Sequence, residues 1–378
     1  MLSSTSLTMA TSALVGGLLA PSPATITLPL GLTYLCMMLT MIPGSMLMRR
    51  RGRRLGFAIG GFAGMLGGTT SAIAIYQGNF VLFCLGSGLF GIANGFSQFY
   101  RFAAAEIADD GYKSRAISWV LAGGLVAAFI GPNVARYTRD LIPEALFSAS
   151  YACLALFCLG VVLVQLFLTI PPPTVEEMSG NRRPLGKVLS QPKFMVAVLC
   201  AMIAYGTMNL LMTATPLAMN QRSMPFSDTA VIIQWHIVGM FAPSFFTGSL
   251  IHRFGVLKVM FVGALLLLGC AVIVLQGQMY QHFFIALIFL GVGWNFLFVG
   301  GTTLLTEVYQ PAEKGEIQGI NDFFVFSATA FTALTSGYFH FLLGWEKLNL
   351  YTMPLVVFAA VIIVLLGFST RTRVVRTA

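Results

Sequence analysis

Charged side chains are scarce in this chain of 378 residues. Asp, Glu, Lys and Arg together make up only 9% of it, whereas 57% of the residues are hydrophobic. A soluble globular domain averages about 25% charged residues. A chain of this length is long enough to bury a core in water, but it lacks the charge that a water-facing surface needs. The composition therefore excludes an ordinary soluble protein and predicts an outer surface that faces lipid.

The motifs of metal, redox and nucleotide sites are missing as well. All six cysteines lie in apolar runs, without a CxxC pair or zinc-ligand spacing, which is typical of small buried side chains. Glycine-rich stretches such as GGFAGMLGG lie inside apolar segments with no strand before them, so they are not nucleotide loops. The sequence also contains no nucleophile triad and no ATPase motif. We therefore expect neither an enzyme nor a cofactor, no metal site and no nucleic-acid partner.

Long apolar stretches are abundant instead. A membrane helix needs about 20 apolar residues to cross ~30 Å of hydrocarbon. Twelve stretches qualify, at 3–20, 26–48, 55–77, 79–104, 116–137, 147–169, 194–217, 228–250, 256–276, 281–306, 317–340 and 348–369. The first is the weakest, because it is short and rich in Ser and Thr.

A polar stretch with three successive prolines, residues 170–193, divides these twelve segments into six and six. We predict an all-α membrane protein with an N-terminal six-helix bundle at 1–169 and a C-terminal one at 194–369. The stretch 170–193 is then a cytoplasmic linker, and residues 370–378 form a short basic tail.

The basic residues indicate an orientation. Loops after even-numbered helices, the linker and the tail contain 17 of the 22 Lys and Arg residues, and the opposite loops contain four. Basic residues concentrate on the cytoplasmic side of membrane proteins. Both termini are therefore predicted to be cytoplasmic. As a separate expectation, the membrane is a bacterial inner membrane.

The two halves share a repeat. In SMLMRRRGRR (45–54) and GSLIHRFGVL (248–257), an arginine and a glycine recur at the same places, which pairs Arg50 with Arg253 and Gly52 with Gly255. At a shift of 201 residues, Asn94 matches Asn295 and Glu106 matches Glu307. Each glycine follows the second helix of its half, where a sharp reversal favours a residue that tolerates positive φ.

GSLIHRFGVLK resembles the cytoplasmic loop signature of the major facilitator superfamily of transporters. Gly248, Leu250, His252, Arg253 and Gly255 match it. The N-terminal copy departs from the signature, because Ser45 replaces the glycine and Arg49 replaces the usual aspartate. The resemblance implies two pseudo-symmetric six-helix bundles of twelve helices.

It also implies that such loops latch neighbouring helices as the halves rock. The residues expected in this gating role are Arg50, Gly52, Glu106, Gly248, Arg253, Gly255 and Glu307. For Glu106 and Glu307 the alternative is contact with the substrate.

Ionisable residues at membrane depth are functional candidates by default. Arg101 is predicted to face the cavity and bind a polar or anionic solute; alternatively it reaches the cytoplasmic surface or pairs with Glu106. Asp322 and His236 are candidates for proton coupling. The alternatives are a carboxylate in contact with water or paired with Lys314, and a neutral core histidine.

Amides and aromatic residues complete the predicted binding set, because a cavity of such side chains suits a planar or ring-bearing solute. The alternative is hydrogen bonding between helices. With Arg101, the set comprises Asn94, Tyr205, Asn209, Gln234, Trp294 and Asn295.

The predicted function is secondary active transport of a small organic solute by alternating access, in a monomer coupled to protons. A polar or anionic metabolite is favoured over the alternative of drug efflux, and a non-transporting sensor or scaffold is the third possibility.

Overall fold

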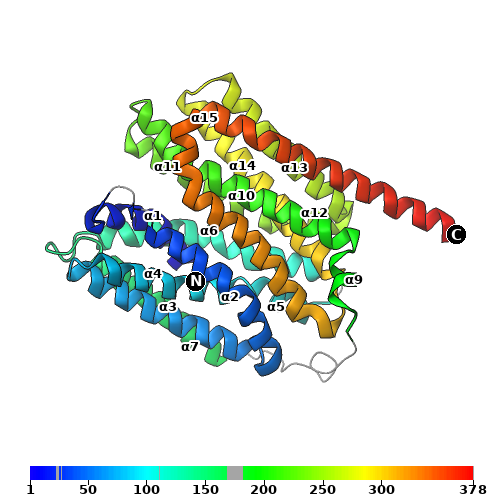
Figure 1. Cartoon of the computed structure of the whole chain (residues 1–378), viewed down its shortest axis with the longest axis horizontal. Coiled ribbons are helices and arrows are strands. Elements are labelled where there is room, and N and C mark those ends of the chain that lie inside the picture. Colours follow the sequence, from blue (N-terminus) through cyan, green and yellow to red (C-terminus); the bar gives the residue numbers. More distant parts are fainter. Residues whose placement is uncertain (23–24, 27, 110, 168–181, 378) are drawn as a thin grey trace. The chain divides into compact units, whose positions relative to one another are not determined.

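The described part of the chain is helical. The computed structural model describes residues 1–22, 25–26, 28–109, 111–167 and 182–377, and no strand occurs among them (Figure 1). The α-helices are α1 (Leu2–Leu19), α2 (Leu28–Arg51), α3 (Arg53–Tyr76), α4 (Phe80–Ser97), α5 (Tyr100–Ile107), α6 (Lys113–Thr138), α7 (Ser148–Phe167), α9 (Leu185–Leu189), α10 (Pro192–Gln221), α11 (Phe226–Phe241), α12 (Ser244–Phe254), α13 (Val256–Gln276), α14 (Tyr280–Thr306) and α15 (Lys314–Thr377). A 3₁₀ turn, Pro311–Glu313, precedes α15. The all-α prediction is confirmed.

Within these residues, ten helices are long and apolar enough to cross a membrane. α4 and α5 combine into one such span and α11 and α12 into another. The predicted spans 3–20 and 317–340 are helical, as α1 and the first part of α15, but they are not among the ten. The span 317–340 contains many polar side chains, which lower its mean hydropathy.

α15 consists of two helices. Gly344 interrupts it with a φ of 73°, and the ribbon turns sharply between its orange and red parts in Figure 1. Only glycine adopts this conformation without steric cost. The first part of α15 and the part after Gly344 therefore correspond to the last two predicted helices.

Contacts group the chain into two compact units, each of which is described by itself. Unit 1 comprises Met1–Ala103, Val126–Arg182 and Gln310–Ala330, and unit 2 comprises Ala104–Leu125, Arg183–Tyr309 and Phe331–Ala378. Residues 170–181 of the predicted linker lie outside the described residues, and α9 falls in the remainder of it. The boundaries predicted along the sequence stay a prediction.

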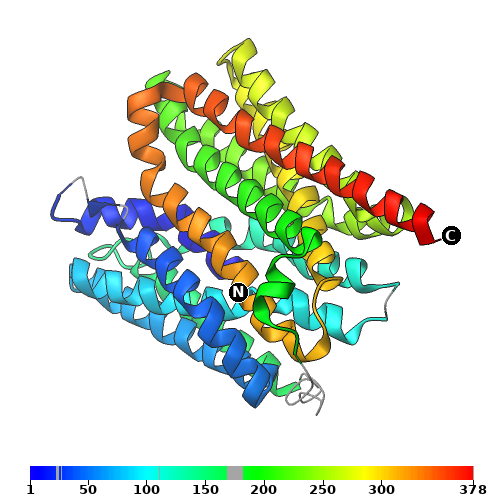
Figure 2. The same cartoon turned by 45° about the vertical axis from the view of Figure 1, so that its right-hand side comes forward.

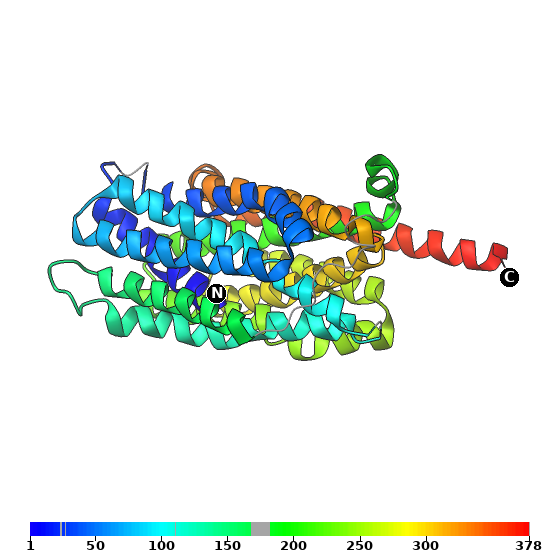
Figure 3. The same cartoon turned by 90° about the horizontal axis from the view of Figure 1, so that it is seen from below.

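In unit 1, α3 packs between α4 and α7, and α2 packs on α4. Figures 2 and 3 both show α2, α3 and α4, in blue, running side by side. The close approach depends on glycine. A Cβ added to Gly67 of α3 would lie 2.7 Å from the backbone nitrogen of Phe90 in α4. Small residues of this kind let membrane helices pack by close contact.

In unit 2, α14 is the central helix. It packs against α10, α11 and α13, and nearly all of its side chains from Leu290 onwards are buried. The candidate binding residues of this unit lie on α14 and on the helices that surround it.

The repeated glycines have the backbone that the sequence predicts. Gly52, between α2 and α3, has φ 87° and ψ 155°, and Gly255, between α12 and α13, has φ 92° and ψ 148°. Two loops at equivalent places in the two halves therefore make the same turn.

Candidate functional site

A buried ion pair lies in unit 1. The guanidinium Nη2 of Arg101 is 2.5 Å from Oδ1 of Asp322, and the two side chains are 2% and 0% exposed. Asn321 donates to the same carboxylate oxygen at 2.7 Å. Nη1 of Arg101 donates to the side chain and to the backbone carbonyl of Gln98, at 3.0 and 3.1 Å. Oδ2 of Asp322 is buried and has no hydrogen-bond partner among the described residues.

The sequence singled out Arg101 and Asp322 as separate candidates, and the structure brings them together. The two residues are 221 positions apart, and the pair links the α4–α5 span to the first part of α15. Breaking a buried pair by removing one partner leaves an uncompensated buried charge, which is strongly unfavourable. Removal of either partner alone is therefore expected to destabilise unit 1.

The polar face of α1 is a feature that the sequence analysis did not identify. Ser4, Ser6, Thr8, Thr11 and Ser12 are all at most 8% exposed. On the same helix Thr5 donates to Oδ1 of Asn94 at 2.7 Å, which places that predicted residue beside these hydroxyl groups. The high Ser and Thr content of residues 3–20 was the available signal, and we interpreted it as weakness of the span.

Four aromatic side chains meet in unit 2. Trp294 stacks on Phe298 with ring centroids 5.2 Å apart and planes 17° apart, and Tyr205 contacts both rings edge-on at 5.2 and 4.9 Å. Phe241 contacts Trp294 at 5.9 Å. We call these residues of α10, α11 and α14 the aromatic cluster. The indole Nε1 of Trp294 is buried and has no hydrogen-bond partner in the described part of the chain.

Asn295, the neighbour of Trp294, is fully engaged. Its Oδ1 accepts from Thr247 at 2.7 Å, and its Nδ2 donates to the Met240 carbonyl at 2.7 Å and to Ser244 at 2.6 Å. These bonds fasten α14 to α11 and α12. For Asn295, this geometry agrees with the alternative to solute binding, in which buried amides form hydrogen bonds between helices.

The remaining polar candidates of unit 2 differ in burial. Asn209 is buried and donates to Thr332 at 3.1 Å. Nδ1 of His236 is 2.7 Å from the Leu287 carbonyl, so this nitrogen has the proton; Nε2 is buried without a partner among the residues described. Gln234 is half-buried.

Most of the predicted gating residues lie at or next to helix ends, whereas Gly248 lies in the middle of α12. Gly248 is buried so closely that an added Cβ would lie 2.7 Å from the Cα of Arg115, and its carbonyl accepts from Ser114 at 3.1 Å. Glu307 pairs with Lys193 at 2.6 Å, with both side chains well exposed. Exposed pairs of this kind contribute about 0–1 kcal/mol. Among the other charged members, Glu106 is half-buried, and Arg50 and Arg253 are exposed.

Comparisons with known proteins agree with this architecture. The sequence profile of the Major Facilitator Superfamily matches residues 1–243 and 197–377. The riboflavin transporter RfnT of Brucella anthropi is 40% identical over 356 residues, which is 93% of this chain and 89% of that protein. Among solved structures, the human organic anion transporter MFSD10 (TETRAN) has a TM-score of 0.77 at 14% identity, covering 96% of both chains. The proton:xylose symporter XylE has the same TM-score at 14% identity, covering 95% of this chain and 92% of its own.

Proposed function

This chain belongs to the Major Facilitator Superfamily of membrane transporters, and from that premise we propose that it transports riboflavin. The observation on which the proposal rests is the 40% identity to a riboflavin transporter over 93% of the chain. Riboflavin is a polar metabolite with a planar tricyclic ring, which fits the class of solute favoured by the sequence.

The aromatic cluster supports this substrate. An isoalloxazine ring can stack on or lie edge-on to Tyr205, Phe241, Trp294 and Phe298 when these side chains rearrange around it. The ring also presents carbonyl oxygens and ring nitrogens along one edge. The buried Nε1–H of Trp294 is a donor that such an acceptor would satisfy. Tyr205 and Asn209, one helical turn apart on α10, are proposed to contact the same solute.

We further propose that transport proceeds by alternating access in a monomer, driven by protons. The Arg101–Asp322 pair supports the coupling. Because Oδ2 of Asp322 has no partner among the described residues, a proton bound there would weaken the ion pair without first displacing another donor. His236 is the second candidate. The distribution of basic residues supports cytoplasmic termini. The similarity to a bacterial transporter supports a bacterial inner membrane.

The proposal is tested by counterflow of radiolabelled riboflavin in proteoliposomes that contain the purified protein. We expect exchange that unlabelled riboflavin competes for and that empty liposomes lack. Exchange of apolar or cationic drugs without exchange of riboflavin would replace this proposal by drug efflux. A protein that binds riboflavin but exchanges no solute would indicate a sensor.

The role of Trp294 is tested by Trp294→Phe, which keeps an aromatic ring and removes the N–H donor. We expect the KM for riboflavin to rise about three- to tenfold, the equivalent of one lost hydrogen bond. Trp345→Phe is the matched control, because Trp345 is also buried in unit 2 but stacks on Phe283, outside the aromatic cluster. Equal KM values for Trp294→Phe and for the unaltered protein would remove Trp294 from the site.

A further inference from the structure

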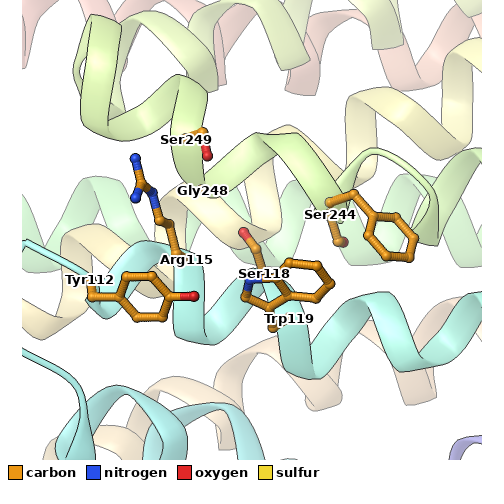
Figure 4. Close-up of a pocket in the computed structure, with 8 residues that line it drawn as sticks. Tyr112, Arg115, Ser118, Trp119, Ser244, Gly248 and Ser249 are labelled. Atoms are coloured by element: carbon orange, nitrogen blue, oxygen red, sulfur yellow. The ribbon is translucent and has the colours of Figure 1, made fainter.

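A cavity of about 210 Å³ lies in unit 2, and no residue of the aromatic cluster lines it (Figure 4). Its walls are the first turns of α6 and the facing side of α12. Figure 4 shows the side chain of Arg115 reaching from α6 toward Ser249 on α12, with Ser118 one turn further along α6. None of the residues predicted to bind solute lines this cavity.

Two polar atoms at the cavity lack partners. Nε of Arg115 and Oγ of Ser118 are both buried and have no hydrogen-bond partner within the described ranges. Ser118 as a whole is 2% exposed. A buried donor without a partner costs about 1–3 kcal/mol. Both atoms can donate, so a group with acceptor oxygens and negative charge would satisfy both.

The start of α6 adds to this preference. Arg115 is the third residue of a helix that begins at Lys113, so the cavity adjoins backbone N–H groups at a positively polarised helix end. Arginine presents a planar set of donors that matches the oxygens of a phosphate. The polar side of the cavity is therefore suited to an oxyanion.

Another part of the lining, which we call the aromatic wall, is accessible. Trp119 and Phe245 are 53% and 48% exposed, and their rings meet edge-on with centroids 5.4 Å apart. Both belong to spans apolar enough to lie in a membrane. Tyr112, 43% exposed, also lines the cavity, with the guanidinium of Arg115 5.8 Å from its ring centroid. Trp and Tyr concentrate at the level of lipid headgroups.

We propose that this cavity binds the phosphate group of an anionic membrane phospholipid. Arg115 and Ser118 bind the phosphate oxygens, and the acyl chains leave over Trp119 and Phe245. Basic pockets between membrane helices are a known setting for headgroup binding. A free phosphate ion offers the same oxygens but makes no use of the aromatic wall, which favours the lipid.

Occupancy of the cavity would affect the region around α14. Ser244 lines the cavity and accepts from Asn295, the neighbour of Trp294. Gly248, which also lines it, packs directly on the backbone of Arg115. A lipid bound here would hold α6 and α12 together at a contact that includes a predicted gating residue. This inference does not depend on which solute is transported.

The test is thermal unfolding of delipidated protein in a neutral detergent, titrated with phosphatidylglycerol. We expect a rise in the unfolding midpoint that saturates, with little effect from diacylglycerol or from inorganic phosphate. In Arg115→Gln and Ser118→Ala, we expect the apparent affinity for phosphatidylglycerol to fall about five- to tenfold. Arg115→Lys keeps the charge and is expected to retain part of the affinity.

Lys258→Gln is the matched control. It removes the same charge from an exposed position near the start of α13, outside the cavity, and should leave the lipid titration unchanged. The proposal would be overturned by equal titrations for Arg115→Gln and the unaltered protein, or by an equal loss in Lys258→Gln. Stabilisation by inorganic phosphate as strong as that by phosphatidylglycerol would also overturn it, in favour of a soluble anion.

Discussion

At the scale of single residues, buried polar groups that have hydrogen-bond partners lie next to buried polar groups that have none among the described residues. Asn295 has all of its bonds, whereas the Trp294 indole nitrogen, one residue earlier, has no partner among the described residues. Asp322 uses one carboxylate oxygen for Arg101 and leaves the other unbonded in that same set. Side chains with full sets of bonds hold helices together, and those with spare groups are the better candidates for solute and proton.

The buried ion pair gives a prediction about stability. Arg101→Met should destabilise the protein by about 3–5 kcal/mol, because it leaves the Asp322 carboxylate buried without its countercharge. The double variant Arg101→Met with Asp322→Leu should recover most of this loss, because no charge is then left unpaired. The free energy of unfolding in detergent, measured as a double-mutant cycle, checks both. Additive losses would show that the two charges do not interact.

Sequence reasoning could identify Arg101 and Asp322, but it could not pair them. Each stands out because charge at membrane depth is rare. The partners that the sequence suggests are near neighbours, Glu106 for Arg101 and Lys314 for Asp322. The ion pair instead depends on the packing of helices that are far apart in the chain, which no local pattern encodes.

At the scale of helices, the packing explains why Ser45 replaces the glycine of the repeat. Ser45 occupies the place that Gly248 holds in the second half, and it packs against Gly319 of α15. A Cβ on Gly319 would overlap the Ser45 hydroxyl. In unit 2 the glycine is on the other helix, since Gly248 faces Ser114 and Arg115. Each contact therefore contains one glycine. In unit 1 the glycine lies on α15, and in unit 2 it lies on α12.

This arrangement predicts that a second substitution can restore the stability lost through a first one. Gly319→Ser should destabilise the protein by about 1–3 kcal/mol through overpacking against Ser45. Adding Ser45→Gly should restore much of that loss, because the smaller residue then lies on α2 as it does on α12. Thermal unfolding of the two variants in detergent measures the difference.

Gly123→Ser in α6 is the control for that experiment. An added Cβ at Gly123 meets nothing within 4 Å in the described structure, so stability should change little. If Ser45→Gly failed to improve Gly319→Ser, the contact would not be the cause of the loss.

At the scale of the whole molecule, the sequence was sufficient for the fold. Apolar length located the helices, and the repeated arginine and glycine indicated two related halves. It did not indicate the junction between α4 and α5. The last-but-one span is only weakly apolar because it contains polar residues such as Asp322, which bonds to another helix. The identity of the solute came from similarity to a relative, since the aromatic cluster alone fits many planar molecules.

Proton coupling gives a prediction for the complete transport cycle. Asp322→Asn should abolish accumulation of riboflavin driven by a pH gradient, because an amide does not take up a proton at physiological pH. Counterflow of riboflavin, which needs no net driving force, should continue at a measurable rate. Both are measured in the same proteoliposomes, so retained counterflow shows that the variant is folded. Undiminished accumulation would exclude Asp322 as the coupling residue and direct attention to His236.

The setting of Trp294 has a spectroscopic consequence. An indole that is enclosed by aromatic rings, and whose nitrogen has no partner among the described residues, should fluoresce at short wavelength, because no polar neighbour relaxes around its excited state. A flavin absorbs in the range where tryptophan emits, so a flavin that docks beside this ring would quench the emission by energy transfer. The chain therefore contains its own optical reporter of occupancy, and no dye has to be attached to follow binding.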